Sequence, residues 1–309
     1  MTPRQELIFI VSGAHVALLG ILGSLVRPGD VVLSEALTYP GIRSVAGQLG
    51  LTLIGLPLDE EGLSADAFAE ACERAAPKAL YVNPTLLNPT THTITAARRA
   101  AIVEIARRFR VMIIEDDACG LLPVDARSSE LRRPRAGADM ACGHAVEVLR
   151  GGLAPGLCRR AGHTVPAGRL PRRLRTATVM ASPLTTALAS QWILDGTADA
   201  LLAAIRQETG ERHKIAAAIL PRGSFRGDPA GFHLWMPLAR PWTRSAFIGQ
   251  VRPTGIGIVG ERRLCRRHHA PGGSAHMPWR PDRPGVAAEC VEFVAHSLAE
   301  TPARASASL

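Results

Sequence analysis

Short apolar runs alternate with helical stretches over residues 7–117, and this alternation constrains the fold more than any other feature of the chain. Apolar runs bounded by turn residues predict strands, and the periodic stretches between them predict helices. The strands are expected at residues 7–11, 31–34, 51–56, 79–82 and 111–114. Apolar strands that are separated by helices form a mainly parallel sheet with both faces covered. We therefore expect an α/β fold with helices on both faces of the sheet.

Helices are expected between these strands and in the second half of the chain. Ser64 and Thr95 stand where side-chain oxygens can accept from unpaired first-turn amides, so they predict helix starts. Helices are expected at residues 15–26, 40–49, 64–75, 95–109, 183–194, 199–220, 245–251 and 286–298, and further strands at 231–236 and 256–259. We expect a large α/β domain over residues 1–195 and a small C-terminal α+β domain over residues 196–309.

Two segments lack this patterning. Residues 120–180 are rich in Arg, Pro and Gly and show no convincing strand pair, and the periodicity fails again after Gly260. Arginine-rich text between well-patterned stretches is typical of a shifted reading frame in a GC-rich gene. We offer a frame shift as a hypothesis for residues 140–175 and 260–284.

Composition excludes several classes of function. The net charge is +9, from 36 basic and 27 acidic residues, and all the basic residues except Lys78 and Lys214 are arginines. The arginines are scattered without a helix-turn-helix pattern, so we expect no nucleic-acid binding by this chain itself. Six cysteines without paired spacing predict free thiols and a cytoplasmic location. No apolar run reaches membrane-spanning length, so no membrane partner is expected.

Two candidate ligand contacts follow the first two strands. Gly13, Ala14 and His15 lie where a strand passes into a helix, and backbone amides at such a helix start can hold a phosphate. The alternative is an ordinary tight turn. Tyr39 follows the second strand and could stack on a flat heterocycle. The alternative is a tyrosine that packs on its own Pro-Gly turn.

Two further candidates follow later strands. Asn88, held by a proline turn, can donate to a phenolate oxygen, or it forms a plain Asx-Pro turn. Asp116 stands at the end of an apolar strand, where a carboxylate can keep a heteroaromatic nitrogen protonated, or it solvates a loop. Because open parallel sheets bind ligands at the carboxyl ends of their strands, we expect the four elements to line one site.

These motifs resemble those of a known family. Their order and approximate spacing are similar to those of the fold type I, class I/II pyridoxal-phosphate aminotransferases, above all the aminotransferase domain of MocR/GntR-type regulators. The motifs are Ser12-Gly13-Ala14, Tyr39-Pro40-Gly41, Asn88-Pro89-Thr90, Glu115-Asp116-Asp117, Leu153-Ala154-Pro155-Gly156-Leu157, Ala181-Ser182-Pro183-Leu184 and Gly231-Phe232-His233-Leu234-Trp235.

The resemblance implies a cofactor, substrates and roles. The cofactor would be pyridoxal 5′-phosphate, with Asp116 on the pyridine nitrogen, Asn88 on the phenolate oxygen and Tyr39 over the ring. The reaction would move an amino group between an amino acid and a 2-oxo acid, in a homodimer. The family's DNA-binding domain is missing upstream, so we expect a truncated remnant.

The chain departs from the family pattern where chemistry is needed. The lysine that holds the cofactor covalently falls on Gly151, and the phosphate-binding arginine falls on Cys158. Glycine offers neither a nucleophile nor a base. Lys78, before a strand, and Lys214, on a solvated helix face, are not credible substitutes. We therefore predict no catalytic residue in this chain and impaired transamination.

Other departures and alternatives remain open. Ala118-Cys119 replaces a tyrosine that supports the phenolate oxygen, and Arg280 and Arg283 are equal candidates for the carboxylate-binding arginine. A rival function is a non-catalytic module that senses the cofactor or an amino acid, and a third possibility is a decayed gene product. A metal site is not predicted, because its candidates are irregularly spaced. These candidates are Cys265, His268, His269 and His276.

Overall fold

The fold is described by a computed structural model. It describes residues 8–124, 140–144, 156–160, 169–177, 180–254, 256–260, 274–278 and 284–300. Contacts divide the chain into two compact units, the first of Met1–Leu87 and His92–Ala203 and the second of Asn88–Thr91 and Ala204–Leu309. The domain boundary after residue 195 stays a prediction.

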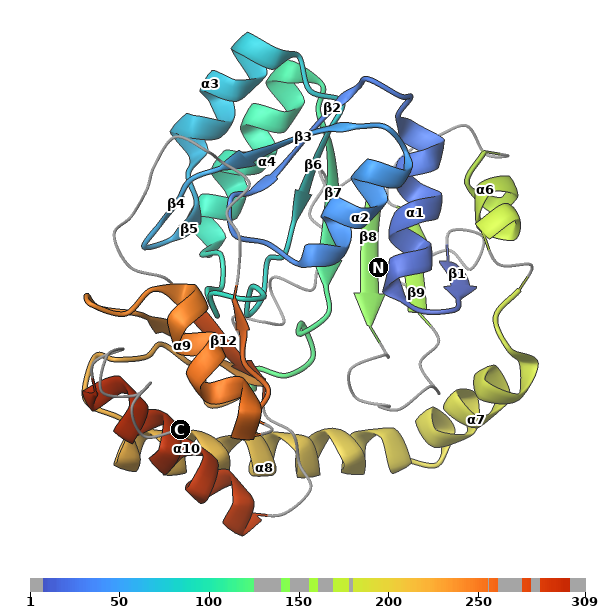
Figure 1. Ribbon diagram of the computed structural model, residues 1–309. Coiled ribbons are helices and arrows are strands. Elements are labelled where there is room, and N and C mark those ends of the chain that lie inside the picture. The colour runs from blue at the N-terminus through green and yellow to red at the C-terminus, as the bar shows by residue number, and fades with distance from the viewer. Residues whose placement is uncertain are drawn as a thin grey trace. The chain divides into compact units, whose positions relative to one another are not determined.

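Seven strands of the described residues form one sheet in the first unit, in the order β1-β9-β8-β7-β6-β2-β3 (Figure 1). The strands are β1 (Ile8–Val11), β2 (Val31–Glu35), β3 (Thr52–Leu56), β6 (Ala79–Val82), β7 (Met112–Asp117), β8 (Met140–His144) and β9 (Gly156–Arg160). The strands from β8 to β3 pair in parallel. Only β9 runs against its neighbours, which are β1 and β8. The mainly parallel sheet is confirmed, and the carboxyl ends of β1, β2, β6 and β7 share one edge.

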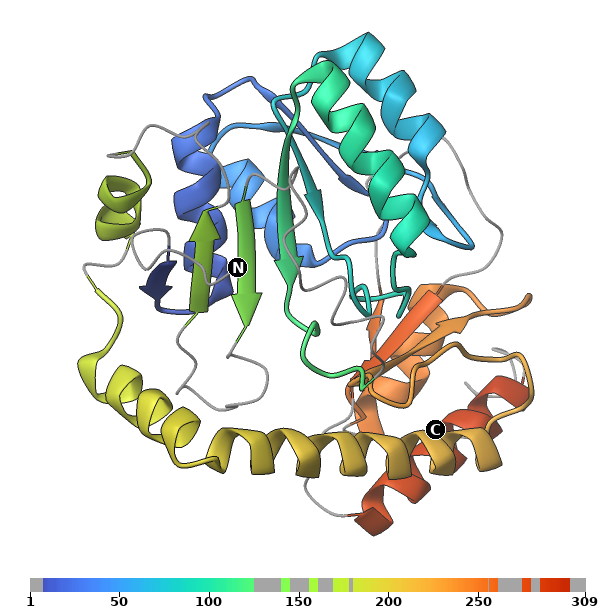
Figure 2. The same ribbon diagram turned by 180° about the vertical axis from the view of Figure 1, so that it is seen from behind.

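Helices cover both faces of this sheet, as Figures 1 and 2 show from opposite sides. One face carries α1 (Ala14–Leu25), α2 (Pro40–Gln48) and α6 (Arg169–Ala177), and the other carries α3 (Ala65–Ala75) and α4 (Ala96–Phe109). Within β6, Ala79 and Tyr81 join the core under α1, whereas Leu80 and Val82 join the core under α3 and α4. Alternate residues of the strand thus face two different apolar cores, which explains why the strand sequences are continuously apolar.

The caps predicted for α3 and α4 are present. Ser64 accepts from the backbone N–H of Ala67 at 3.3 Å, and Thr95 accepts from that of Arg98 at 3.2 Å. Each bond satisfies an amide that the helix itself leaves unpaired. The sequence therefore fixes the start of both helices.

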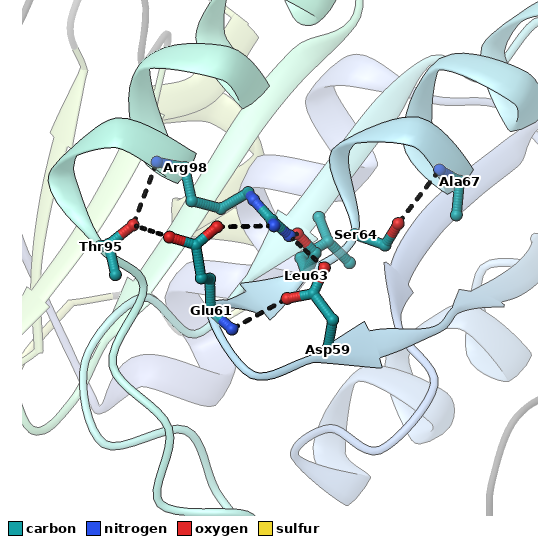
Figure 3. Close-up of polar contacts among 7 residues, drawn as sticks. All are labelled: Asp59, Glu61, Leu63, Ser64, Ala67, Thr95 and Arg98. Atoms are coloured by element: carbon teal, nitrogen blue, oxygen red, sulfur yellow. Dashed lines mark hydrogen bonds and ion pairs between the residues drawn. The ribbon is translucent and has the colours of Figure 1, made fainter.

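A short hairpin of β4 (Leu58–Asp59) and β5 (Gly62–Leu63), absent from the sequence expectations, lies beside the start of α4. Figure 3 shows the Arg98 side chain reaching from α4 into this hairpin. Its guanidinium pairs with Asp59 at 2.7 Å and Glu61 at 2.9 Å, and donates to the Leu63 carbonyl at 2.6 Å. The planar donor fork thus connects helix and hairpin.

The second unit has an antiparallel sheet in the order β10-β12-β11 among its described residues. Its elements are the larger part of α8 (Thr197–Ile219), β10 (His233–Pro237), α9 (Arg244–Val251), a 3-10 turn (Arg252–Thr254), β11 (Val259–Gly260), β12 (Ser274–Pro278) and α10 (Pro284–Ala299). Leu234, Met236, Phe247 and Val291 are fully buried in its core. The preceding helix α7 (Pro183–Leu194) belongs to the first unit.

Three strands contradict the expectation for the unpatterned segments. The prediction of no strand pair within residues 120–180 is wrong, because β8 and β9 pair there. β12 lies in the second such segment, and the strand expected at residues 256–259 is only Val259–Gly260. All three strands are held by pairing with partners on both sides. Such pairing does not require a local apolar period, which explains why the sequence pattern missed them.

Candidate functional site

Asp116 lies near the end of β7 and is buried, with 7% of its surface exposed. Its Oδ2 accepts a hydrogen bond from the Tyr81 hydroxyl at 2.7 Å. Tyr81 lies on the neighbouring strand β6, opposite Ile114 in register. Since alternate residues of a strand share a face, Asp116 lies on the same face as Ile114 and α1. The predicted acid is thus a buried group at the carboxyl edge of the sheet.

A second donor stands behind Tyr81. The side-chain amide of Asn83 donates to the Tyr81 hydroxyl oxygen at 2.8 Å, so both hydrogen bonds point toward Asp116. Burial first, and then the charge of Asp116, raise the pKa of Tyr81 well above its usual value. Tyr81 therefore stays protonated as a donor. Donors aligned in one direction stabilise a negative charge at the end of their chain.

Glu35 connects this chain to the next strand. It ends β2, is 1% exposed, and accepts from the Asn83 backbone N–H at 2.7 Å and the Thr38 hydroxyl at 2.9 Å. Burial, with a smaller contribution from the charge of Asp116, raises the pKa of Glu35 to about 7 against three hydrogen bonds that lower it. Adjacent strands β2, β6 and β7 are thereby joined by polar contacts at one edge.

Tyr39 directly follows Thr38 and precedes the first residue of α2. The side chain is half-buried, and its ring lies over Gly41. A Cβ at Gly41 would come within 2.6 Å of the ring carbon Cζ, so glycine is needed to leave the ring in this position. The contact matches the alternative of a tyrosine packed on its own turn, and stacking on a ligand stays a prediction.

Gly13 forms the N-cap of α1. Its φ of 91° lies in a region that favours glycine, and α1 has neither a side-chain cap nor an acidic residue in its first turn. A Cβ at Gly13 would meet no atom within 4 Å, and His15 is exposed. The first turn of this twelve-residue helix therefore brings no negative side chain to its positive end, and phosphate binding there stays a prediction.

Asn88 is described within its own loop, because Asn88–Thr91 groups with the second unit. A backbone hydrogen bond of 2.7 Å, from the Leu87 N–H to the His92 carbonyl oxygen, joins the two residues that flank this loop. The Oδ1 of Asn88 is buried and has no hydrogen-bond partner among the residues that the structure describes. A buried amide oxygen in this state favours a polar ligand over a self-contained Asx turn.

Both lysines lie among the described residues. Lys78 is exposed and immediately precedes β6, so it lies at the amino end of the strand whose carboxyl end leads to Asn83. Those two residues are about 16 Å apart along an extended chain. Lys214 is 74% exposed on α8 and pairs with Glu211 at 2.8 Å. The expected lack of a catalytic role for both lysines stays a prediction.

Several predicted positions lie outside the described residues. These are Gly151, Arg280, Arg283, Cys265, His268 and His269. Cys158 is described only as a backbone position of β9, opposite Phe9 and Cys142. Among the described residues, no group of His, Cys, Asp and Glu could hold a metal ion. The same residues include no helix long and apolar enough to cross a bilayer.

Residues 2–122 match the profile of the family described as Aminotransferase class I and II. This part of the chain is therefore similar to the class I and II aminotransferases. Its matched part contains the edge residues of β2, β6 and β7 described above. An aromatic amino acid aminotransferase of Schizosaccharomyces pombe is 34% identical over 114 residues, which are 35% of this chain and 24% of that protein.

An uncharacterised HTH-type transcriptional regulator of Bacillus subtilis, YdeF, is similar to a longer part of this chain. It is 25% identical over 270 residues, which cover 85% of this chain and 56% of the regulator. A second B. subtilis regulator, YisV, is covered over 51% of its length. The chain thus spans about half the length of these curated relatives.

The fold is that of the fold type I aminotransferases. The α-aminoadipate aminotransferase LysN of Thermus thermophilus, solved in complex with N-(5′-phosphopyridoxyl)-L-leucine, superposes with a TM-score of 0.84. The identity is 21%, and the match covers 99% of this chain and 79% of that one. At this identity the likeness establishes the fold alone.

The polar residues behind Asp116 escaped the sequence reasoning. Tyr81 and Glu35 are embedded in strands that read as apolar, and Asn83 follows one of them directly. Their partners are 35 and 48 residues distant in sequence, for Tyr81 with Asp116 and Asn83 with Glu35. A usable signal was present, because polar residues at the ends of apolar strands require buried partners.

Proposed function

We propose that this chain is an aminotransferase-type domain that holds pyridoxal 5′-phosphate without a covalent bond and is impaired in transamination. The observation that carries the proposal is the buried Asp116, held as a hydrogen-bond acceptor at the carboxyl edge of the sheet. Such an acceptor fits a protonated heteroaromatic nitrogen. The LysN structure, which was solved with a phosphopyridoxyl ligand, adds support from a shared fold.

The donors present fit the parts of this cofactor. Asp116 would hold the pyridine nitrogen, and the N-terminus of α1 at Gly13, Ala14 and His15 would hold the phosphate. As the resemblance implies, the side-chain N–H of Asn88 would donate to the phenolate oxygen. When bound, the cofactor supplies an electron sink that stabilises negative charge on the α-carbon of an amino acid.

The residues do not fit covalent attachment. The position of the family's lysine is Gly151, and the remaining amines are on Lys78 and Lys214. Without a lysine at residue 151, the chain lacks the amine that, by the resemblance, would move a proton to and from the α-carbon of a substrate. Amino acid and 2-oxo acid would bind, but turnover would be very slow.

The test is an absorbance titration of the purified protein with pyridoxal 5′-phosphate, followed by borohydride reduction. We expect saturable binding, no absorbance of a lysine-bound cofactor, and no cofactor retained after reduction and unfolding. Cofactor trapped on Lys78 or Lys214 would contradict the non-covalent proposal. An absence of saturable binding would refute cofactor binding altogether.

A second candidate function is a ligand-sensing module of a MocR-type regulator. It is favoured by the YdeF match, which covers 85% of this chain, whereas the S. pombe aminotransferase match covers 35%. N-(5′-phosphopyridoxyl)-L-leucine needs no lysine for binding and is therefore the appropriate probe. Tight binding of this compound together with undetectable transamination favours sensing, and measurable transamination of amino acids argues against it.

We also propose that the protein works as a homodimer in the cytoplasm. On α7, Leu184, Ile193 and Leu194 are 77%, 59% and 83% exposed in the single chain, which is unfavourable in water without a partner. Among the described residues, Cys72, Cys119 and Cys290 form no disulfide, as a reducing compartment favours. Sedimentation equilibrium at micromolar concentration measures the assembly, and a monomer would rule out the dimer.

A further inference from the structure

The side chains around Tyr81 form a directed chain of hydrogen bonds. The Asn83 amide donates to the Tyr81 hydroxyl oxygen at 2.8 Å, and the Tyr81 hydroxyl donates to Asp116 Oδ2 at 2.7 Å. Tyr81 is fully buried, and Asn83 and Asp116 are each 7% exposed. Because water has little access, these two donors help to orient and polarise this carboxylate oxygen.

The backbone of Asn83 is itself fixed. Its N–H donates to Glu35 Oε1 at 2.7 Å, and Glu35 is anchored in turn by the Thr38 hydroxyl at 2.9 Å. The donor pair is therefore held from β2 as well as from its own strand. A carboxylate in such a setting loses little freedom when a cation or an N–H donor approaches it.

We propose that Tyr81, with Asn83 behind it, is a positioning residue that holds Asp116 oriented as a hydrogen-bond acceptor for the ring nitrogen of the bound cofactor. This inference rests on the proposed function. It assigns to Tyr81 an effect on one atom of the ligand, the nitrogen that faces Asp116, and none on the ring carbons or the phosphate.

The test compares two ligands in Tyr81→Phe, which keeps the ring and removes only the hydroxyl. The first ligand is pyridoxal 5′-phosphate, and the second is its 1-deaza analogue, in which carbon replaces the ring nitrogen. Loss of one hydrogen bond to a charged group is worth about tenfold in affinity. We expect Tyr81→Phe to weaken the first ligand about tenfold and the second less than twofold, by calorimetric titration.

Two further measurements separate positioning from damage to the fold. Asn83→Ala removes the second donor and leaves Tyr81 on Asp116, so we expect a smaller loss of about threefold, again only for the nitrogen-containing ligand. The ¹⁵N shift of ring-labelled cofactor should move toward the unprotonated value in Tyr81→Phe. Far-ultraviolet circular dichroism checks that both variants are folded.

The outcomes distinguish this inference from the proposed function. Wild-type protein that binds neither ligand overturns both. Wild-type binding combined with equal losses for the two ligands in Tyr81→Phe overturns the inference alone, because a structural defect does not sense one ring atom. Unchanged affinity and an unchanged ¹⁵N shift in Tyr81→Phe overturn it as well.

Discussion

At the residue scale, the buried carboxyl of Glu35 makes the stability of the protein depend on pH. Its pKa rises on folding from 4.5 to about 7, mainly through burial. The folded state therefore holds the proton more tightly than the unfolded state. The contribution is complete below pH 4.5 and is lost as the pH rises through about 7.

We expect Glu35→Gln to abolish this pH dependence. In the wild type, the free energy of unfolding should fall by on the order of 3 kcal/mol between pH 4.5 and 8. Glutamine has the same shape but cannot ionise, so this fall should be absent in Glu35→Gln. Urea unfolding across that range measures it. Glu60→Gln, at an exposed position, is the control and should follow the wild type. Parallel curves for wild type and Glu35→Gln would show that Glu35 does not titrate in this window.

A second residue-scale prediction concerns the ring of Tyr39. Gly41→Ala places a Cβ against that ring and must move it, whereas a Cβ at Gly47 in the same helix meets nothing within 4 Å. Alanine should favour the helix by about 0.5–1 kcal/mol at either position. We expect Gly41→Ala, but not Gly47→Ala, to weaken pyridoxal 5′-phosphate binding severalfold. Equal affinities in a binding titration would remove Tyr39 from the proposed site.

At the element scale, Arg98 attaches the β4–β5 hairpin to α4 (Figure 3). Its side chain is 14% exposed and makes two ion pairs and one carbonyl contact from a single guanidinium. Arg98→Lys keeps the charge but loses the fork, so we expect a loss of about 1–2 kcal/mol in unfolding free energy.

The control for Arg98 is another arginine ion pair on the same unit. Arg74 pairs with Glu70 at 3.1 Å, with the two side chains 72% and 60% exposed. Solvent screens such a pair, so Arg74→Lys should leave the unfolding curve unchanged. If both substitutions had the same small effect, the hairpin attachment would not depend on the fork geometry of Arg98.

The helices and strands also show which parts of the fold could be predicted from the sequence. The strand Ala79–Val82 was predicted to the residue because its burial imposes a local pattern, and the helix Pro183–Leu194 because Ser182 and Pro183 mark its start. Strands β8, β9 and β12 were not, because they are specified by distant partners. The same holds for the candidate site. Asp116 could be predicted because it lies at a strand end, whereas the role of Tyr81 depends on a hydrogen bond to a residue 35 positions away in the sequence.

At the scale of the whole molecule, the scarcity of lysine permits a test that few proteins allow. Replacing Lys78 and Lys214 by arginine yields a chain without any lysine while keeping the charge. Lys78 is exposed at the amino end of β6, and Lys214 forms one surface ion pair, so the fold should tolerate both changes. We expect the lysine-free protein to bind pyridoxal 5′-phosphate within twofold of wild type.

Adding one lysine back then tests whether residue 151 is the position of covalent cofactor attachment. In the lysine-free background, Gly151→Lys should restore cofactor that survives borohydride reduction, because the resemblance places the covalent attachment at that position. Mass spectrometry of the reduced protein identifies the modified residue. Serine in place of Gly151 is the control and should bind without attachment. We expect non-covalent binding in every variant and covalent attachment only in Gly151→Lys, because the proposed site keeps Asp116 but lacks the lysine. If Gly151→Lys retained no cofactor after reduction, residue 151 would not face the site.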